Sequence, residues 1–187
     1  SSSSENEWED YEPVSSSSVS VSSSSESDEK ETFTDSRDGQ TYKYVKIGNQ
    51  VWMAENLNYE TANSYCYNDS TENCKKYGRL YTWEATLNAC PEGWHLPTNE
   101  EFETLISNVG GEEYAAELLK STTGWQTGNG IDKYGFNVLP AGYRNYYGGI
   151  FSDAGERANF WSATEFNENL AYYLDFHYHK ASLSSNY

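Results

Sequence analysis

Positive charge is scarce in this sequence. Its 187 residues include 12 lysine and arginine residues against 29 aspartate and glutamate residues, a formal net charge of -17. So few cations cannot neutralise a row of phosphates, which excludes nucleic acid as a partner and disfavours an anionic membrane surface. No apolar run approaches the roughly 18 residues of a membrane span, and no basic segment followed by an apolar one opens the chain. We therefore expect a protein that does not span a membrane.

Leucine, isoleucine and valine are also sparse, whereas the chain carries 17 tyrosines and 6 tryptophans. Each buried tyrosine hydroxyl must find a hydrogen-bond partner or water, so this many tyrosines cannot all belong to a dry core. Some of them are expected to line a wet surface.

Residues 1–33 differ in composition from the rest of the chain. Tetraserine recurs three times, and nine acidic residues stand between or beside the serine runs against Lys30 alone. Such a segment buries too little apolar surface to offset its ordering entropy. We expect a disordered Ser/acidic tether over 1–33 and a folded domain over 34–187.

The folded part opens with a hairpin signature. In TYKYVKIGNQVWM the side chains alternate, Gly48-Asn49 marks a turn, and Val51 to Met53 re-enters. The following Asn-, Ser- and Tyr-rich stretch to residue 78 is expected to be a loop. Leu80, Trp83 and Leu87 recur at helical spacing, which predicts a helix over 79–89.

Two more helices are predicted further on. Thr98 and Glu101 form a capping box, and Phe102, Leu105, Ile106 and Val109 then make one apolar stripe, which ends at Gly110. A shorter helix is expected over 112–120. From residue 121 onward, glycines alternate with aromatics, which is typical of loops and short strands. Near the end, LAYYLDFHYH alternates as a strand with one wet face.

Five stretches, in this order, resemble one known family. VWMAENLNY, YGRLYTWEAT, CPEGWHLPT, GFNVLPAGYRN and FWSATE are similar to motifs of the Fibrobacter succinogenes major paralogous domain, over roughly residues 34–180. The resemblance implies an α+β, C-type-lectin-like fold related to sulfatase-modifying factors, with two to three helices, a small twisted antiparallel sheet and long irregular loops. It also implies an exported protein, secreted or on the outer cell surface, with room for a lipid anchor upstream of the tether.

This sequence departs from the family pattern at its end. Members typically continue with a last strand of the kind GFSVRC, whereas here the residues are Ser184, Ser185, Asn186 and Tyr187. We therefore expect the domain to lack that strand and its cysteine.

The resemblance to an exported family also bears on what is expected of the three cysteines. In an exported protein Cys66 and Cys74, which bracket a polar loop, most simply form a disulfide. No CxxC motif or paired histidine accompanies them, so no metal is expected. The resemblance implies that Cys90 in relatives bridges to the C-terminal cysteine that is missing here. Cys90 is therefore expected as a free thiol, buried or open to pairing with another chain. His95 is expected in a semi-core position with its imidazole bonded to backbone.

An enzyme is the least favoured class, and no cofactor is expected. A reactive Cys90 would need a base beside it and a lowered pKa. A glycosidase would need two carboxylates about 5–10 Å apart, and Asp132, Asp153, Glu156 and Glu165 are only nominal candidates.

The favoured function is a non-catalytic binding module for carbohydrate or another surface polymer, because sugar rings stack on aromatics while their hydroxyls bond to polar side chains. The lectin calcium signatures Glu-Pro-Asn, Gln-Pro-Asp and Trp-Asn-Asp are absent. An alternative is a protein–protein interaction or structural component of the cell surface, with an unpaired sheet edge that a partner completes. The candidate ligand residues are Tyr143, Arg144, Asn145, Tyr146, Tyr147, Trp161, Glu165, Asn167 and Asn169.

Overall fold

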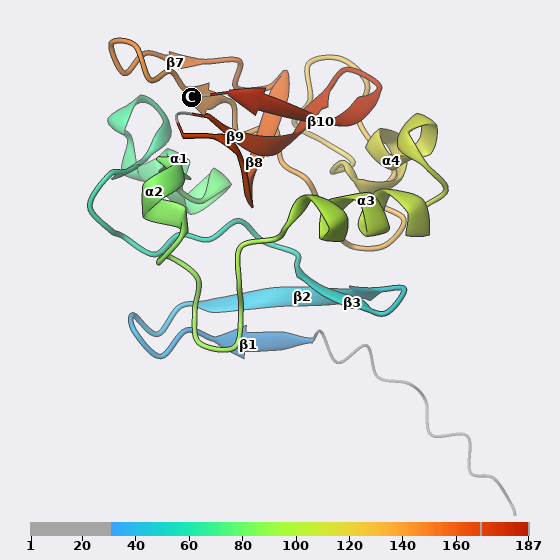
Figure 1. The fold of residues 1–187 in the computed structure, drawn as a ribbon, viewed down its shortest axis with the longest axis horizontal. Coiled ribbons are helices and arrows are strands. Elements are labelled where there is room, and N and C mark those ends of the chain that lie inside the picture. The colour runs from blue at the N-terminus through green and yellow to red at the C-terminus, as the bar shows by residue number, and fades with distance from the viewer. Residues whose placement is uncertain (1–30, 169, 187) are drawn as a thin grey trace, which may run out of the picture.

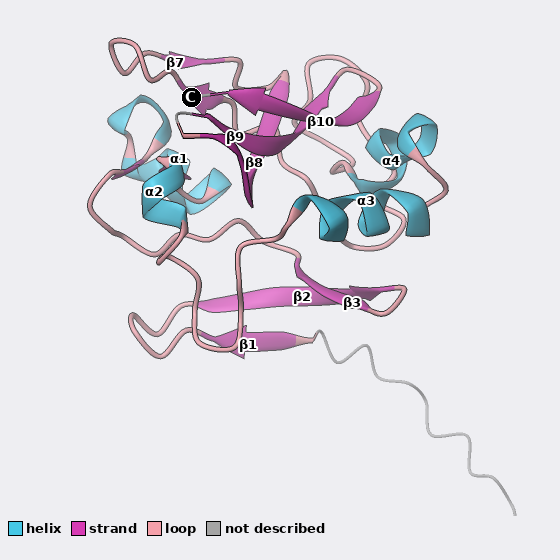
Figure 2. Cartoon of the chain, viewed as in Figure 1, coloured by secondary structure: helices cyan, strands magenta, loops and turns pink. Residues whose placement is uncertain are grey.

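The computed structural model describes residues 31–168 and 170–186, and over that part the chain combines short helices with small antiparallel sheets (Figure 1, Figure 2). The helices are α1 (Thr71–Tyr77), α2 (Trp83–Thr86), α3 (Asn99–Asn108) and α4 (Glu112–Leu119). The strands are β1 (Thr32–Thr34), β2 (Thr41–Ile47), β3 (Gln50–Met53), β4 (Ser64–Tyr65), β5 (Leu80–Tyr81), β6 (Tyr143–Arg144), β7 (Phe151–Ser152), β8 (Arg157–Asn167), β9 (Leu170–His177) and β10 (Lys180–Asn186). The expected mixture of helices, small antiparallel sheets and long loops is confirmed, with four helices in the described residues where two to three were expected. None of these helices is long and apolar enough to cross a membrane.

The first sheet has the order β1-β2-β3 and contains the predicted hairpin. Val45 pairs with Trp52 across β2 and β3, and the two strands turn at Gly48-Asn49. Strand β1 takes in Thr32 and Phe33, two residues that had been assigned to the end of the tether. Residues 1–30 of that tether lie outside the described residues.

Helix α3 begins at the predicted capping box. The Thr98 hydroxyl accepts a hydrogen bond from the Glu101 backbone N–H, and the Glu101 carboxylate accepts one from the Thr98 N–H at 2.8 Å. Phe102, Leu105 and Ile106 are buried in the main core cluster, as their spacing predicts. Helix α4, predicted over 112–120, is confirmed over Glu112–Leu119.

The helix predicted over 79–89 is wrong for most of its length. Leu80 and Tyr81 are extended and pair with β4, and Thr82 then caps a helix of only four residues. Leu87, expected on the buried face, is 48 % exposed. The spacing of Leu80, Trp83 and Leu87 matched a helical stripe by chance, because the strand pairing that interrupts it depends on residues 15 and 17 positions earlier.

The loop expected between residues 58 and 78 contains helix α1, which the sequence did not predict. Its composition of Asn, Ser and Lys gives no apolar stripe, and only Cys74 is buried within it. The helix begins inside the loop that the Cys66–Cys74 disulfide closes and continues past Cys74 to Tyr77.

The second sheet, in the order β10-β9-β8, has two unlike faces. One face carries Ala158, Phe160, Leu174, Phe176 and Ala181, which belong to or pack against the core cluster containing α3 and α4. The opposite face carries Arg157, Asn159 and Trp161 on β8, directly across from His177, Asp175 and Tyr173 on β9. The expectation of a strand with one wet face is confirmed for β9.

Candidate functional site

Part of the wet face of β8 and β9 lines a cleft with a volume of about 1490 Å³, to which Arg157, Asn159, Trp161 and Tyr173 contribute. The candidate ligand residues gather around this cleft, although they come from two segments of the sequence. Those that line it are Tyr143, Arg144, Asn145, Tyr146, Tyr147, Trp161, Glu165 and Asn167. Asn169 lies outside the described residues. The structure thus brings the predicted set together, and their binding role stays a prediction.

The short hairpin of β6 and β7 presents two tyrosines at the lip of the cleft. The Asn145 backbone N–H donates to the Ile150 carbonyl at 2.7 Å, which closes the loop. The Asn145 side-chain oxygen accepts from the Tyr147 N–H at 2.7 Å. Asn145 therefore shapes the loop, and this leaves Tyr146 73 % and Tyr147 68 % exposed. Large aromatic rings this exposed are the ones available to a ligand.

Trp161 is part of the wall and has a structural task. Its indole N–H donates to the Tyr81 carbonyl at 2.9 Å, and its ring packs edge-on against Tyr173. Nearby, the Trp83 indole N–H donates to the Ser162 carbonyl at 2.9 Å. These two bonds tie β8 to the segment of β5 and α2. Trp161 can offer a ring edge to a ligand, but it is not a free stacking platform.

A polar cluster around Arg157, which itself lines the cleft, was missed in the sequence. The Arg157 Nε lies 3.5 Å from the Asp175 carboxylate and 3.8 Å from that of Asp153, and an Nη lies 3.3 Å from His177 Nδ1. Burial raises the pKa of Asp175, and the charge of Arg157 offsets only part of that effect. The two-residue alternation from Arg157 to Trp161 was the signal that could have found this cluster.

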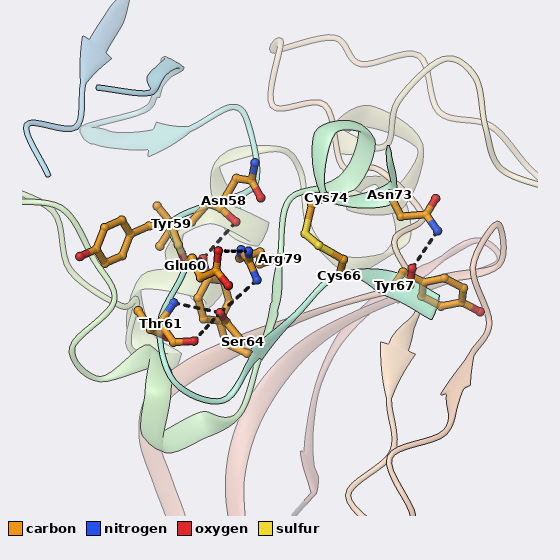
Figure 3. The surroundings of a disulfide bond; sticks show 12 residues. Asn58, Tyr59, Glu60, Thr61, Ser64, Cys66, Tyr67, Asn73, Cys74 and Arg79 are labelled. Carbon is orange, nitrogen blue, oxygen red and sulfur yellow. Dashed lines mark hydrogen bonds and ion pairs between the residues drawn. A yellow bond between two sulfur atoms is a disulfide. The ribbon is translucent and has the colours of Figure 1, made fainter. Parts of the chain in front are cut away.

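The predicted disulfide between Cys66 and Cys74 is confirmed, with the two Cα atoms 4.9 Å apart. Figure 3 shows its surroundings, where the Asn73 amide donates to the Tyr67 carbonyl and Arg79 pairs with Glu60. The Tyr67 ring lies 5.4 Å from the ring of Phe151 in β7. The disulfide loop therefore packs against the hairpin of β6 and β7.

We expect the double substitution Cys66→Ser with Cys74→Ser to lower the free energy of unfolding by roughly 2.5 kcal/mol, because the loop would regain its closure entropy in the unfolded state. Urea denaturation measures this. The matched control is Cys90→Ser, which removes a thiol and leaves the loop closed. Equal unfolding midpoints for the double variant and the control would contradict a stabilising role.

Cys90 is the free cysteine of the described residues, and it is partly buried on the cleft lining. Burial raises the pKa of its thiol, which is the opposite of what a nucleophile needs. His95 was expected in a semi-core position bonded to backbone, and this is wrong. Its ring is exposed, and its Nε2 lies 2.8 Å from the Glu101 carboxylate, so it extends the capping box of α3. Burial alone would raise the pKa of Glu101, but the hydrogen bonds from Thr98 and His95 lower it.

Within the described residues, side-chain hydrogen bonds and ion pairs do not bring the nominal catalytic acids together in one place. The Asp132 carboxylate accepts from the Asn137 N–H at 2.8 Å and so holds a turn. Asp153 faces Arg157, and Glu165 is exposed near the end of β8. Among the described residues no group of three or more His, Cys, Asp or Glu side chains is placed to hold a metal ion.

Comparison with known proteins gives one match. The model of the Fibrobacter succinogenes major domain matches residues 45–185, which is most of the chain. No curated protein and no solved structure matches this sequence.

Proposed function

The chain belongs to the Fibrobacter succinogenes major domain family, and from that premise we propose that it is an exported, non-catalytic module that binds a carbohydrate polymer at the cell surface. The ligand site is the cleft beside the hairpin of β6 and β7. Tyr146 and Tyr147 stack on sugar rings, and the polar side chains of the cleft bond to hydroxyl groups.

The observation that carries this proposal is the exposure of two adjacent tyrosines at the lip of the cleft. Their rings meet edge-to-face, 5.5 Å between centroids, so two differently oriented flat surfaces are presented side by side. Exposed Glu165 and Asn167 line the same cleft and supply acceptors and donors. Flat apolar surfaces with a few polar groups around them are the usual composition of a sugar site.

The arrangement of helices, small sheets and long loops also supports a finer fold assignment. We propose a C-type-lectin-like fold, supported by the pair α3 and α4, the small antiparallel sheets and the long glycine-punctuated segment between α4 and β8. In that fold the late loops carry the ligand, which agrees with a site at the hairpin of β6 and β7.

Export is supported by the Cys66–Cys74 disulfide, because such bonds persist in oxidising compartments. The net charge of -17 is compatible with a surface location, since an acidic coat keeps exported domains apart.

Affinity electrophoresis of the whole chain against cellulose, xylan and pectin fragments tests the proposal. We expect retardation in at least one of these gels, and no retardation in a gel without polysaccharide. Turnover of chromogenic glycosides is the accompanying assay. Migration unchanged across a broad glycan panel, or turnover that one acid substitution abolishes, would contradict a non-catalytic glycan binder.

A structural or protein-binding role at the cell surface is the second candidate. Strand β10 lies at the edge of its sheet, and within residues 31–168 and 170–186 it pairs only with β9. An edge strand can accept a strand from a partner. Stoichiometric recovery of one protein from an outer-membrane extract, with no glycan bound, would favour this role.

A further inference from the structure

One arginine of the cleft lacks the partner that the others have. The chain contains four arginines, all described, against 29 acidic residues. Arg37, Arg79 and Arg157 each have a carboxylate within 4.0 Å. Within the described residues Arg144 has none, and its Nε is buried without a hydrogen-bond partner. The Nε of Arg157 is also buried without a hydrogen bond, but two carboxylates lie within 4.0 Å of it, so the missing carboxylate is what distinguishes Arg144.

Arg144 packs against two aromatic rings and the backbone of the hairpin. Its guanidinium lies 3.9 Å from the centre of the Tyr65 ring and 5.7 Å from that of Phe151. On another side Gly149 approaches so closely that a Cβ there would collide with the guanidinium. Gly149 also has a φ of +67°, which favours glycine. The guanidinium therefore occupies the space beside Gly149 that a side chain at that position would need.

A fixed, stacked guanidinium is suited to one kind of ligand group. Its planar fork matches the two oxygens of a carboxylate, and little rotamer entropy remains to be lost on binding. Arg144 lines the same cleft as the exposed Tyr146 and Tyr147. A ligand that pairs with Arg144 and stacks on Tyr146 and Tyr147 has a carboxylate next to a flat ring.

We propose that the cleft selects a carbohydrate bearing uronic acid and that Arg144 pairs with the uronate carboxylate; this rests on the proposed carbohydrate-binding function. The cleft also contains acidic side chains, among them Glu55, Glu84, Glu165 and Glu168. Like charges repel a densely charged chain, so the ligand is a neutral backbone with isolated uronate substituents. A peptide rich in Asp or Glu fits less well, because it has no rings for the two tyrosines.

Calorimetry with matched oligosaccharides tests the inference. The probes are glucuronosyl xylotriose, the same compound with its carboxyl reduced to the alcohol, and oligogalacturonate. We expect wild-type protein to bind the first about 10-fold or more tightly than the second, with a difference that shrinks as salt rises, and to bind oligogalacturonate more weakly.

The variants Arg144→Gln and Arg144→Lys show whether Arg144 causes the difference in affinity between the acidic and the reduced probe. We expect Arg144→Gln to bind the acidic and reduced probes equally, Arg144→Lys to keep part of the difference, and the charge-matched control Lys180→Gln to keep all of it. Lys180 is exposed at the start of β10 and does not line the cleft. If Arg144→Gln fails to fold, the comparison of the two probes on wild-type protein still shows whether the cleft selects the carboxylate.

The outcomes separate the two proposals. Equal binding of the acidic and reduced probes by wild-type protein would overturn the role of Arg144 and leave carbohydrate binding standing. Binding of an oligoaspartate peptide in place of every sugar would overturn both.

Discussion

Replacement of Lys120 by alanine is expected to lower the free energy of unfolding by about 3–5 kcal/mol, the largest stability effect we predict for a single substitution. Lys120 is 1 % exposed and follows α4 directly. Its ammonium donates to the carbonyls of Gly128 and Tyr178 and lies 3.8 Å from the centre of the Trp125 ring. Truncation removes these bonds, leaves both carbonyls without that donor and opens a void beside the indole.

Lys120→Met is the matched control, because it fills nearly the same volume without the ammonium. We expect it to lose less stability than Lys120→Ala, since it leaves no void and buries no charge. Urea denaturation of both variants at neutral pH measures the difference. Indistinguishable unfolding midpoints for wild type and Lys120→Ala would show that the side chain does not connect α4 with the turn between β9 and β10.

The same lysine predicts a pH dependence with a definite sign. Burial lowers the pKa of Lys120 to about 8 in the folded protein. Between that value and the ordinary pKa of about 10.4, the unfolded chain carries the proton and the folded chain does not. Unfolding then takes up a proton, so raising the pH disfavours it. The stability of wild type relative to Lys120→Met is expected to rise by on the order of 2 kcal/mol between pH 8 and pH 10. A flat or falling difference would contradict this.

The second large effect concerns binding. Removing both rings, in Tyr146→Ala with Tyr147→Ala, is expected to weaken the affinity for a bound glycan by roughly 30- to 100-fold, because each ring provides about 1–1.5 kcal/mol of stacking and apolar contact. Both side chains are mostly exposed, so the melting temperature should change little. Calorimetry measures the affinity, and thermal denaturation measures the stability.

Tyr114→Ala is the matched control for this pair. Tyr114 is a half-exposed tyrosine on α4 and does not line the cleft. We expect its removal to leave glycan affinity unchanged. If the double variant bound glycan as tightly as wild type, the tyrosine lip would have no part in recognition.

Local signals in the sequence predicted the elements that depend on neighbours along the chain. The hairpin at Gly48-Asn49, the capping box of Thr98 and Glu101 and the helix after it each rest on a few adjacent residues. The short interval between Cys66 and Cys74 gave the disulfide in the same way. Such motifs act through one turn of backbone, so their outcome does not wait for tertiary structure.

Elements that depend on distant pairing could not be predicted in this way. The extended Leu80–Tyr81 forms because it pairs with Ser64–Tyr65, and helical spacing nearby concealed it. The candidate residues of the cleft were identified by type and loop context, but the parts played by Tyr65 and Arg157 were not. Their roles follow from the register of β8 on β9 and from the loop folded against β7, neither of which a single segment encodes.

The most direct test of the central claim, a carbohydrate cleft beside the hairpin of β6 and β7, is amide chemical-shift mapping of the whole chain during titration with an oligosaccharide that it binds. We predict that the perturbed amides cluster in residues 143–150 and along the Arg157 to Trp161 face of β8, with little change in α4 or β2. Perturbations confined to β10 or to the helices, with the hairpin silent, would contradict it.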